Sequence, residues 1–356
     1  PVEEEIVRLN RYALVLVVLL VAAPLAACGG SSAPGTTSTA STATTAAAPS
    51  TTTGTPATPG AAGGNLTFTD ATGTTVTLPH PARRVVCLVG LCEDIMAALG
   101  LPPVAVNDTY SQDPHLFGAQ AKSFAMIGGS FTAPNIEDIA KATPDLVIGI
   151  ANADEQLRPA LKPIAPLFIM NPATYQDSIT YLEDIGRLTG RTAQAAAAAQ
   201  KFTTELATYK AQSPNNVSTV LIYGAGPNFN VFTTGSLTPS VLQQVTPYAV
   251  PAPTTGAPAS SDHEPGAIPG SLEQLLTINP DTILVASFAF TPTAKTISQQ
   301  LASDPVWSQL KAVKDHRVYE VNANYYVFGR GTISLGLALQ DTMSKLYPSV
   351  VATPTP

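Results

Sequence analysis

The chain has 356 residues, of which 45% are hydrophobic and 12% are charged, and its formal net charge is −7. At about 150 residues per domain this length suggests two domains, and the low charge content predicts a surface made largely of uncharged polar residues. A nucleic-acid partner requires a basic face that neutralises phosphates. No cluster of Lys and Arg extends beyond Arg83-Arg84, so the composition excludes that class.

The first segment has the order of an export signal. Arg8 and Arg11 precede an apolar run over 12–23, which is shorter than the roughly 20 apolar residues of a membrane span and suits a signal-peptide core. The run ends in Leu25-Ala26-Ala27-Cys28-Gly29, which resembles the bacterial lipobox. We therefore expect a signal peptide over 1–27 and a lipid on the thiol of Cys28; the alternative is an ordinary cleaved signal with an incidental cysteine.

A low-complexity segment follows. Residues 29–64 are almost all Gly, Ser, Thr, Ala and Pro, a composition that buries too little apolar surface to offset the entropy of ordering. We predict that 28–64 form a disordered tether beginning at lipidated Cys28. Such a tether would keep the folded part close to a membrane partner, at high effective concentration.

The folded region begins with two alternating segments, Leu66–Thr69 and Thr75–Leu78, which predict a hairpin. Short continuous apolar runs, typical of buried parallel strands, occur at 84–88, 104–106, 146–150, 167–170, 219–223, 282–285 and 318–321. Helical segments are predicted at 93–99 and 178–188. Strands that alternate with helices indicate parallel sheets.

A long helical segment divides the folded region. Residues 192–209 include five consecutive alanines and no Gly or Pro. We predict an N-terminal α/β lobe over 65–190, an interlobe helix over 191–213, a C-terminal α/β lobe over 214–348 and a disordered tail over 349–356. The ligand cleft is expected between the lobes.

An internal repeat supports this division. Asn135-Ile136-Glu137 leads to Pro144-Asp145 and a strand, and Ser271-Leu272-Glu273 leads to Pro280-Asp281 and another strand. The Glu, Pro and Asp residues recur at identical spacing, and one copy falls in each predicted lobe.

These motifs resemble the substrate-binding proteins of ABC importers for ferric siderophores, haem and cobalamin, the class III periplasmic binding proteins. The resemblance rests on segments 68–73 and 81–86, on the two repeat windows, and on the closing segments 304–307 and 313–319. It covers roughly 66–347 and implies two Rossmann-like lobes with parallel sheets joined by one long helix. It also implies a lipid-anchored monomer on the outer face of the cytoplasmic membrane, acting with a permease and its ATPase.

The resemblance assigns one exposed glutamate of each lobe to permease docking. These glutamates match Glu137 and Glu273. The alternative is local, because an anion in the first turn of a helix is favoured by the helix dipole. A structural effect of that kind accounts less well for the same position in both lobes.

Six residues are candidates for the ligand cleft. Arg330 lies among aromatic residues in a loop that contains glycine, and a guanidinium offers a planar fork of donors to oxygen atoms of an anionic chelate. The alternative is a surface arginine beside core aromatics. The other five candidates are Cys92, Tyr110, His115, Tyr223 and Tyr326. The expected ligand is an Fe(III)-siderophore complex, and haem and cobalamin are the alternative ligands. The alternative role is that of a surface sensor or co-receptor that takes no part in transport.

Cys87 and Cys92 depart from the family pattern, in which small polar residues are more usual at the first strand-to-helix turn. They lie five positions apart in a chain expected outside the cytoplasm. A disulfide is one outcome and two free thiols the other, since disulfide geometry is strict.

Motifs of enzymes and metal sites are missing from the sequence. It contains no Gly-x-Ser-x-Gly elbow, His-Glu-x-x-His pair or phosphate-binding loop, so we predict a binding protein. No CxxC pair is present, and a zinc site is therefore not expected. Asp262-His263-Glu264 could ligate a metal, but a solvated loop tip is the simpler interpretation.

Overall fold

The structure, a computed structural model, describes residues 65–253, 264–288, 291 and 293–350. The predicted signal peptide, the tether and Cys28 lie outside these ranges. So do Asp262, His263 and residues 351–356 of the predicted tail. No helix within the described ranges combines the length and the apolar character that a membrane span needs.

The first lobe contains a fully parallel sheet behind the predicted hairpin. The antiparallel hairpin joins β1 (Leu66–Thr69) to β2 (Thr75–Leu78). The sheet has the order β5-β4-β3-β8-β9. Its strands are β3 (Val85–Cys87), β4 (Ala105–Val106), β5 (Ala125–Met126), β8 (Leu146–Ile150) and β9 (Leu167–Met170). Strands β3, β4, β8 and β9 are buried at every position, as expected for a sheet covered on both faces.

Helices and short turns connect these strands. The helices of the first lobe are α1 (Gly90–Ala98), α2 (Ile136–Lys141), α3 (Arg158–Leu161) and α4 (Tyr175–Leu188). Short 3₁₀ segments occupy Tyr110–Gln112, Gly118–Ser123 and Glu155–Leu157, and a small hairpin joins β6 (Gly129–Ser130) to β7 (Ala133–Pro134).

The second lobe contains the expected parallel strands and adds one antiparallel strand to the sheet. Its order is β12-β11-β10-β13-β14. The strands are β10 (Thr219–Gly224), β11 (Asn230–Phe232), β12 (Ala267–Pro269), β13 (Thr282–Ser287) and β14 (Val318–Glu320). Strands β10, β13 and β14 are parallel, whereas β11 pairs antiparallel with both β10 and β12. Strands β11 and β12 have three residues each, too few to show a periodicity in the sequence.

The helices of the second lobe are mostly short. They are α6 (Leu237–Leu242), α7 (Leu272–Ile278), α8 (Ile297–Leu301), α9 (Lys311–Lys314) and α10 (Thr332–Leu346), with a 3₁₀ turn at Trp307–Gln309 and a π-helical turn at Asn324–Phe328. The exception is α10, which packs along α5.

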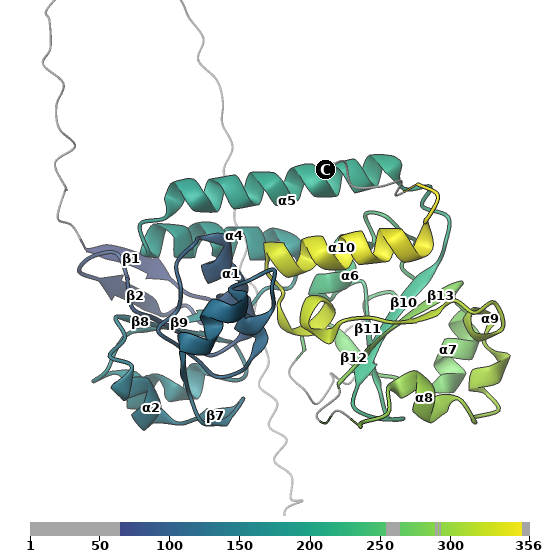
Figure 1. Ribbon diagram of the computed structural model, residues 1–356, viewed down its shortest axis with the longest axis horizontal. Helices are drawn as coiled ribbons and strands as arrows, with labels where there is room; N and C mark the ends of the chain where they lie inside the picture. The colour runs from purple at the N-terminus through teal and green to yellow at the C-terminus, as the bar shows by residue number, and fades with distance from the viewer. Residues whose placement is uncertain (1–64, 254–263, 289–290, 292, 351–356) are drawn as a thin grey trace, which may run out of the picture. The chain divides into compact units, whose positions relative to one another are not determined.

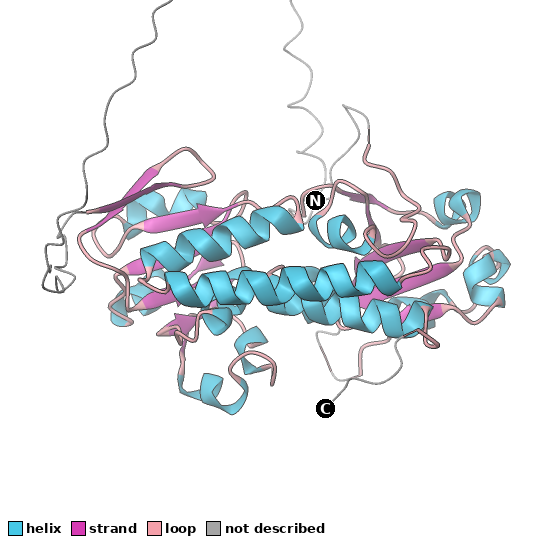
Figure 2. Ribbon diagram, turned by 90° about the horizontal axis from the view of Figure 1, so that it is seen from above, coloured by secondary structure: helices cyan, strands magenta, loops and turns pink. Residues whose placement is uncertain are grey.

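The long helix α5 (Thr192–Gln212) is shared by the cores of both lobes. Ala195 and Ala199 belong to the core of the first lobe, whose buried residues run from Val76 to Ala199. Phe202 and Leu206 belong to a core of the second lobe. Helices α4, α5 and α10 lie side by side over the two sheets (Figures 1 and 2). One continuous helix therefore connects the two lobes.

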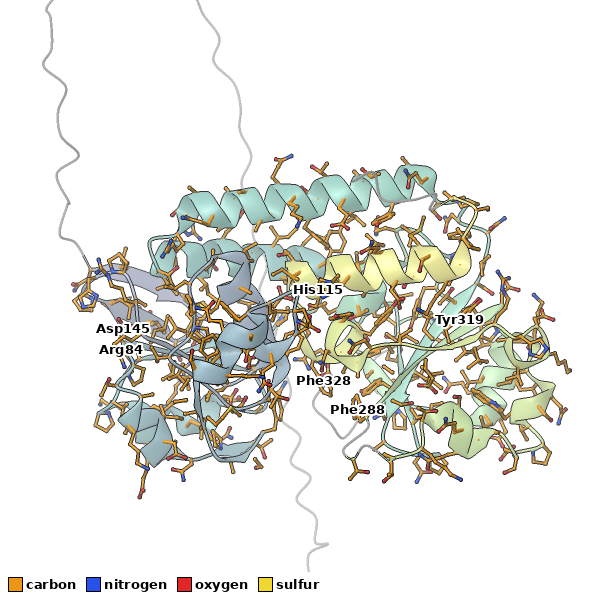
Figure 3. All side chains as sticks on the ribbon, in the orientation of Figure 1. Arg84, His115, Asp145, Phe288, Tyr319 and Phe328 are labelled. Atoms are coloured by element: carbon orange, nitrogen blue, oxygen red, sulfur yellow. A yellow bond between two sulfur atoms is a disulfide. The ribbon has the colours of Figure 1, made fainter. Side chains whose placement is uncertain are left out.

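The repeated Pro-Asp motif has the same structural role in both lobes. Asp145 accepts hydrogen bonds from the backbone N–H groups of Arg83 and Arg84, at 2.8 and 2.9 Å (Figure 3). Asp281 accepts from the backbone N–H and the hydroxyl of Ser218, both at 2.8 Å. Each aspartate precedes a central strand and fixes the residues that lead into the neighbouring strand, so the sequence repeat corresponds to a repeated unit of structure.

Candidate ligand-binding cleft

A cavity of about 520 Å³ lies between the lobes, at the carboxyl ends of their parallel strands. Val89 and Ala151 follow β3 and β8, and Phe288 follows β13. The other lining residues are Gly90, Asp108, Thr109, Tyr110, Phe131, Ile150, Tyr223, Glu264, Asn324, Val327, Phe328 and Arg330. Open α/β sheets bind ligands at this edge, because the loops that follow the strands converge there.

Aromatic side chains form much of the wall. Phe131 from the first lobe and Phe328 from the second are 46% and 38% exposed, which is unusual for such apolar side chains. The rings of Phe288 and Phe328 lie 4.9 Å apart between centroids (Figure 3), and the ring of Tyr223 stacks on Phe232 at 4.3 Å. The cleft therefore offers flat apolar surface from both sides.

Arg330 lines the cleft, but its guanidinium is paired with a carboxylate. It forms an ion pair with Glu264, and the two side chains are only 10% and 12% exposed. Its Nε donates to the carbonyl of Val327 at 2.9 Å, and its own carbonyl accepts from Ser178 Oγ at 2.7 Å. The backbone of Arg330 is left-handed, with φ of 59°. These contacts hold the side chain in one place and compensate its charge.

Two acidic groups, one lining the cavity and one buried beside it, lie at the first-lobe wall. Asp108 lines the cavity and accepts a hydrogen bond from the backbone N–H of Tyr110 at 2.7 Å. The fully buried Glu93 lies beside it. Burial, and then the negative charge of Asp108, raise the pKa of Glu93 to about 10, so Glu93 is protonated at neutral pH. Burial also raises the pKa of Asp108. The described lining residues from the first lobe include no Lys or Arg.

The structure brings three of the six predicted cleft residues together. Tyr110, Tyr223 and Arg330 line the cavity. Tyr326 does not, because it is fully buried in the second lobe and its hydroxyl donates to the carbonyl of Ala338 at 2.9 Å. Its neighbours in the π-helical turn, Val327 and Phe328, line the cavity instead.

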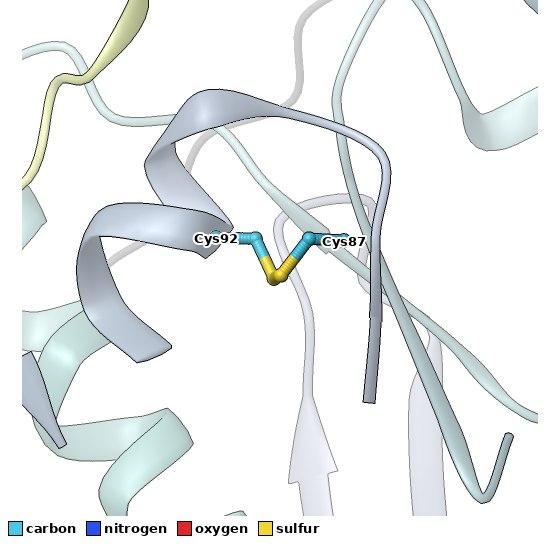
Figure 4. The surroundings of a disulfide bond; sticks show 2 residues. All are labelled: Cys87 and Cys92. Carbon is cyan, nitrogen blue, oxygen red and sulfur yellow. A yellow bond between two sulfur atoms is a disulfide. The ribbon is translucent and has the colours of Figure 1, made fainter. Parts of the chain in front are cut away.

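Cys92 also lies away from the cavity. It is fully buried and joined to Cys87 by a disulfide, with the two Cα atoms 5.4 Å apart (Figure 4). The bond connects the end of β3 to the first turn of α1. Cys92 therefore shapes the loop that carries Val89 and Gly90, and it is not among the residues that line the cavity.

His115 lines a different hollow, of about 590 Å³, between α1, α5 and α10. Its Nδ1 lies 3.0 Å from Asp113 Oδ1 and 3.2 Å from the hydroxyl of Tyr325. The two hollows share no lining residue. His115 therefore takes part in a contact between the lobes and is not among the residues that line the cavity.

Sequence reasoning missed Asp108, Phe131, Phe288 and Phe328, which all line the cavity. A usable signal existed for two of them: Asp108 and Phe288 come two and three residues after the ends of the predicted strands 104–106 and 282–285, in the region where ligand-binding loops begin. Phe131 lies in the small hairpin and Phe328 in the π-helical turn, and neither element has a sequence pattern of its own.

The predicted docking and metal residues occupy defined places. Glu137 and Glu273 are both exposed and both lie at the second residue of a helix, after the N-caps Asn135 and Ser271. Glu264 of the 262–264 segment pairs with Arg330. Among the residues that the structure describes, no group of three metal-binding side chains comes together.

Comparison with known proteins agrees with this architecture. The chain is 27% identical over 274 residues to the Fe(3+) dicitrate-binding periplasmic protein FecB of Escherichia coli, covering 76% of this chain and 86% of that one. It is 26% identical over 278 residues to the Fe(3+)-citrate-binding protein YfmC of Bacillus subtilis, covering 76% and 83%. The crystal structure of the petrobactin-binding protein YclQ from Bacillus subtilis superimposes with a TM-score of 0.66 at 19% identity, covering 80% of this chain and 99% of that one. Because the periplasmic binding protein family matches residues 85–325, the chain belongs to that family.

Proposed function

We propose that this protein is the extracytoplasmic solute-binding component of an ABC importer, and that it captures a ferric chelate and delivers it to the permease. The observation that carries the proposal is the cavity of about 520 Å³, which both lobes build at the carboxyl ends of their strands. The names of FecB and YfmC, which match most of this chain, support a ferric chelate as the ligand. Haem and cobalamin are the alternative ligands of the same resemblance.

Docking to the permease is assigned to Glu137 and Glu273. Their exposure supports this assignment, since a carboxylate that a partner reads must be accessible. Their equivalent positions support it too, because one partner with two basic pockets could contact both lobes at once. A non-transport sensor on the same fold would not require both glutamates.

The anchoring of the protein rests on the sequence. The segment Leu25–Gly29 and the low-complexity residues after it support a lipid on Cys28 and a location at the outer face of the cytoplasmic membrane. A tether would raise the local concentration of the binding protein at the permease. Fractionation of cells that express Cys28→Ala tests this: the variant should leave the membrane fraction, and continued membrane association would contradict the lipid.

Ligand binding is tested by native mass spectrometry of the protein purified from its own cells, followed by titration calorimetry with ferric chelates, haem and cobalamin. A bound mass that contains iron is expected, with a Kd below about 10 μM, which corresponds to roughly −7 kcal/mol. Failure of every ferric chelate to bind at that level would contradict the proposed function. A sensor would bind a chelate but support no uptake, which separates the two candidates.

A further inference from the structure

The charge of the cleft restricts the ligand further. Among the described lining residues, Arg330 is the only Lys or Arg, and it is ion-paired with Glu264. Asp108 and Glu264 add two carboxylates to the same lining. The segments of the second lobe outside the described ranges, 254–263, 289–290 and 292, contain no Lys or Arg in the sequence. The cleft therefore supplies no net positive charge.

A multiply charged anion is a poor ligand for such a site. Transfer of a charge from water into a partly buried cavity is costly unless an opposite charge compensates it, and like charges that face each other add a further penalty. Ferric dicitrate and ferric tris-catecholates are anions. A ferric ion bound by three singly charged hydroxamates is neutral, because the charges cancel within the complex.

The apolar walls point in the same direction. Three large hydrophobic side chains are exposed within the described residues, and two of them, Phe131 and Phe328, line the cleft from opposite lobes. Contact between these rings and an apolar ligand surface is favourable in free energy, because it removes apolar surface from water. Thr109 and Asn324 add uncharged hydrogen-bonding groups to the lining.

We propose that the ligand of this cleft is a ferric chelate without net negative charge, of the trihydroxamate type, held between the aromatic walls of the two lobes. This inference rests on the proposed function and makes it specific. It distinguishes this protein from FecB and YfmC, whose names specify ferric citrate. At 26–27% identity the residues that line a cleft are free to differ.

The test is titration calorimetry of the full-length chain in detergent with three probes: a neutral ferric trihydroxamate, ferric dicitrate and a trianionic ferric tris-catecholate. We expect the neutral probe to bind at least about 100-fold more tightly than either anion. Its Kd should change less than about twofold between about 50 mM and about 500 mM salt, because no net charge interaction is screened. Equal or tighter binding of an anion would overturn the inference and leave the proposed function intact. Binding of none of the three would contradict the proposed function itself.

A variant isolates the charge argument. Glu264→Gln removes the carboxylate that compensates Arg330, and we expect it to raise the affinity for ferric dicitrate about tenfold while changing that for the neutral probe less than about threefold. Glu183→Gln is the matched control, since it makes the same change in net charge at an exposed position of α4 outside the cleft. Thermal unfolding of both variants verifies that they are folded. An unchanged affinity for ferric dicitrate in folded Glu264→Gln would show that the charge of Arg330 does not control ligand choice.

Discussion

Asp281 shows how a single residue of the repeat contributes to stability. The pKa of Asp281 is lowered from 3.8 to about 2, mainly because Lys311 donates a hydrogen bond to its carboxylate. Burial acts in the opposite direction, and hydrogen bonds from Ser218 lower the pKa further. A carboxyl group whose pKa is lower in the folded than in the unfolded state stabilises the protein at pH values above the unfolded-state pKa. This stabilisation is lost as the pH falls through the folded-state pKa. The contribution of Asp281 should therefore be complete at neutral pH and disappear between about pH 4 and pH 2.

We predict that Asp281→Asn lowers the free energy of unfolding by about 1–3 kcal/mol at pH 7, because hydrogen bonds to a charged group are lost. The difference from the parent should shrink as the pH approaches 2. Denaturant unfolding at several pH values measures it. Asp315→Asn is the control. Asp315 Oδ2 also lies 3.7 Å from Lys311 Nζ, but its side chain is 47% exposed, and exposed ion pairs contribute little to stability. An equal loss in both variants would contradict the role of Asp281.

The second prediction for individual residues concerns how much the Cys87–Cys92 disulfide stabilises the protein. It closes a short loop between Cys87 and Cys92, and the chain-entropy relation gives roughly 2 kcal/mol for a loop of that length. Replacement of both cysteines by Ala should therefore lower the free energy of unfolding by about 2 kcal/mol. Thiol titration of the denatured, unreduced mature protein should find neither cysteine free. Two reactive thiols from these positions would rule out the bond in solution.

At the scale of elements, the sequence predicted the parts whose pattern is local. The runs at 146–150 and 167–170 are strands β8 and β9 with the predicted bounds. The predicted segment 192–209 is a helix that continues to Gln212. Strands β11 and β12 were missed, since each has only three residues and β12 is held by pairing with β11, far from it in the sequence. The cleft could be predicted only in part for the same reason: Phe131 and Phe328 come together through the arrangement of the lobes, which no local pattern encodes.

The start of α10 depends on a carboxylate from the other lobe. Asp94 of α1 accepts hydrogen bonds from the backbone N–H groups of Ile333 and Ser334, at 3.1 and 2.8 Å. It is fully buried, and burial is the main cause that raises its pKa from 3.8 to about 6. A raised carboxylate pKa means that the folded state holds the proton more tightly than the unfolded state, so stability falls as pH rises between these two values.

We predict that the parent loses about 2–3 kcal/mol of unfolding free energy between about pH 4 and pH 7 relative to Asp94→Asn, since a shift of one unit corresponds to about 1.4 kcal/mol. The Asn amide oxygen keeps an acceptor for α10 without the titration. Parallel denaturant curves at pH 4 and pH 7 give the comparison. If the difference between the two proteins does not vary with pH, Asp94 does not titrate in this range.

At the scale of the whole folded region, the lobes are connected by more than α5. Tyr325 of the second lobe donates to Asp113 of the first at 2.8 Å, and the backbone N–H of Tyr175 in α4 donates to Ser240 Oγ at 2.9 Å. Together with the Asp94 contact to α10, these bonds fix the relative orientation of the two sheets. A partner that contacts both lobes would therefore bind Glu137 and Glu273 at a defined distance from each other.

The paired glutamates give the prediction that concerns the molecule as a transport component. Both are exposed at helix starts, so Glu137→Ala and Glu273→Ala should each cost less than about 1 kcal/mol of stability, the magnitude of the helix-dipole effect. Neither lines the cavity, and ligand affinity should therefore stay unchanged.

Uptake of radiolabelled ferric chelate by cells should fall in each variant and further in the double variant. Charge reversal to Arg should reduce uptake most, because like charges would then face each other across the interface. Asp138→Ala is the matched control, as Asp138 shares the first turn of α2 with Glu137. Normal uptake by a stable Glu137→Arg/Glu273→Arg protein would leave both glutamates as helix-start residues only.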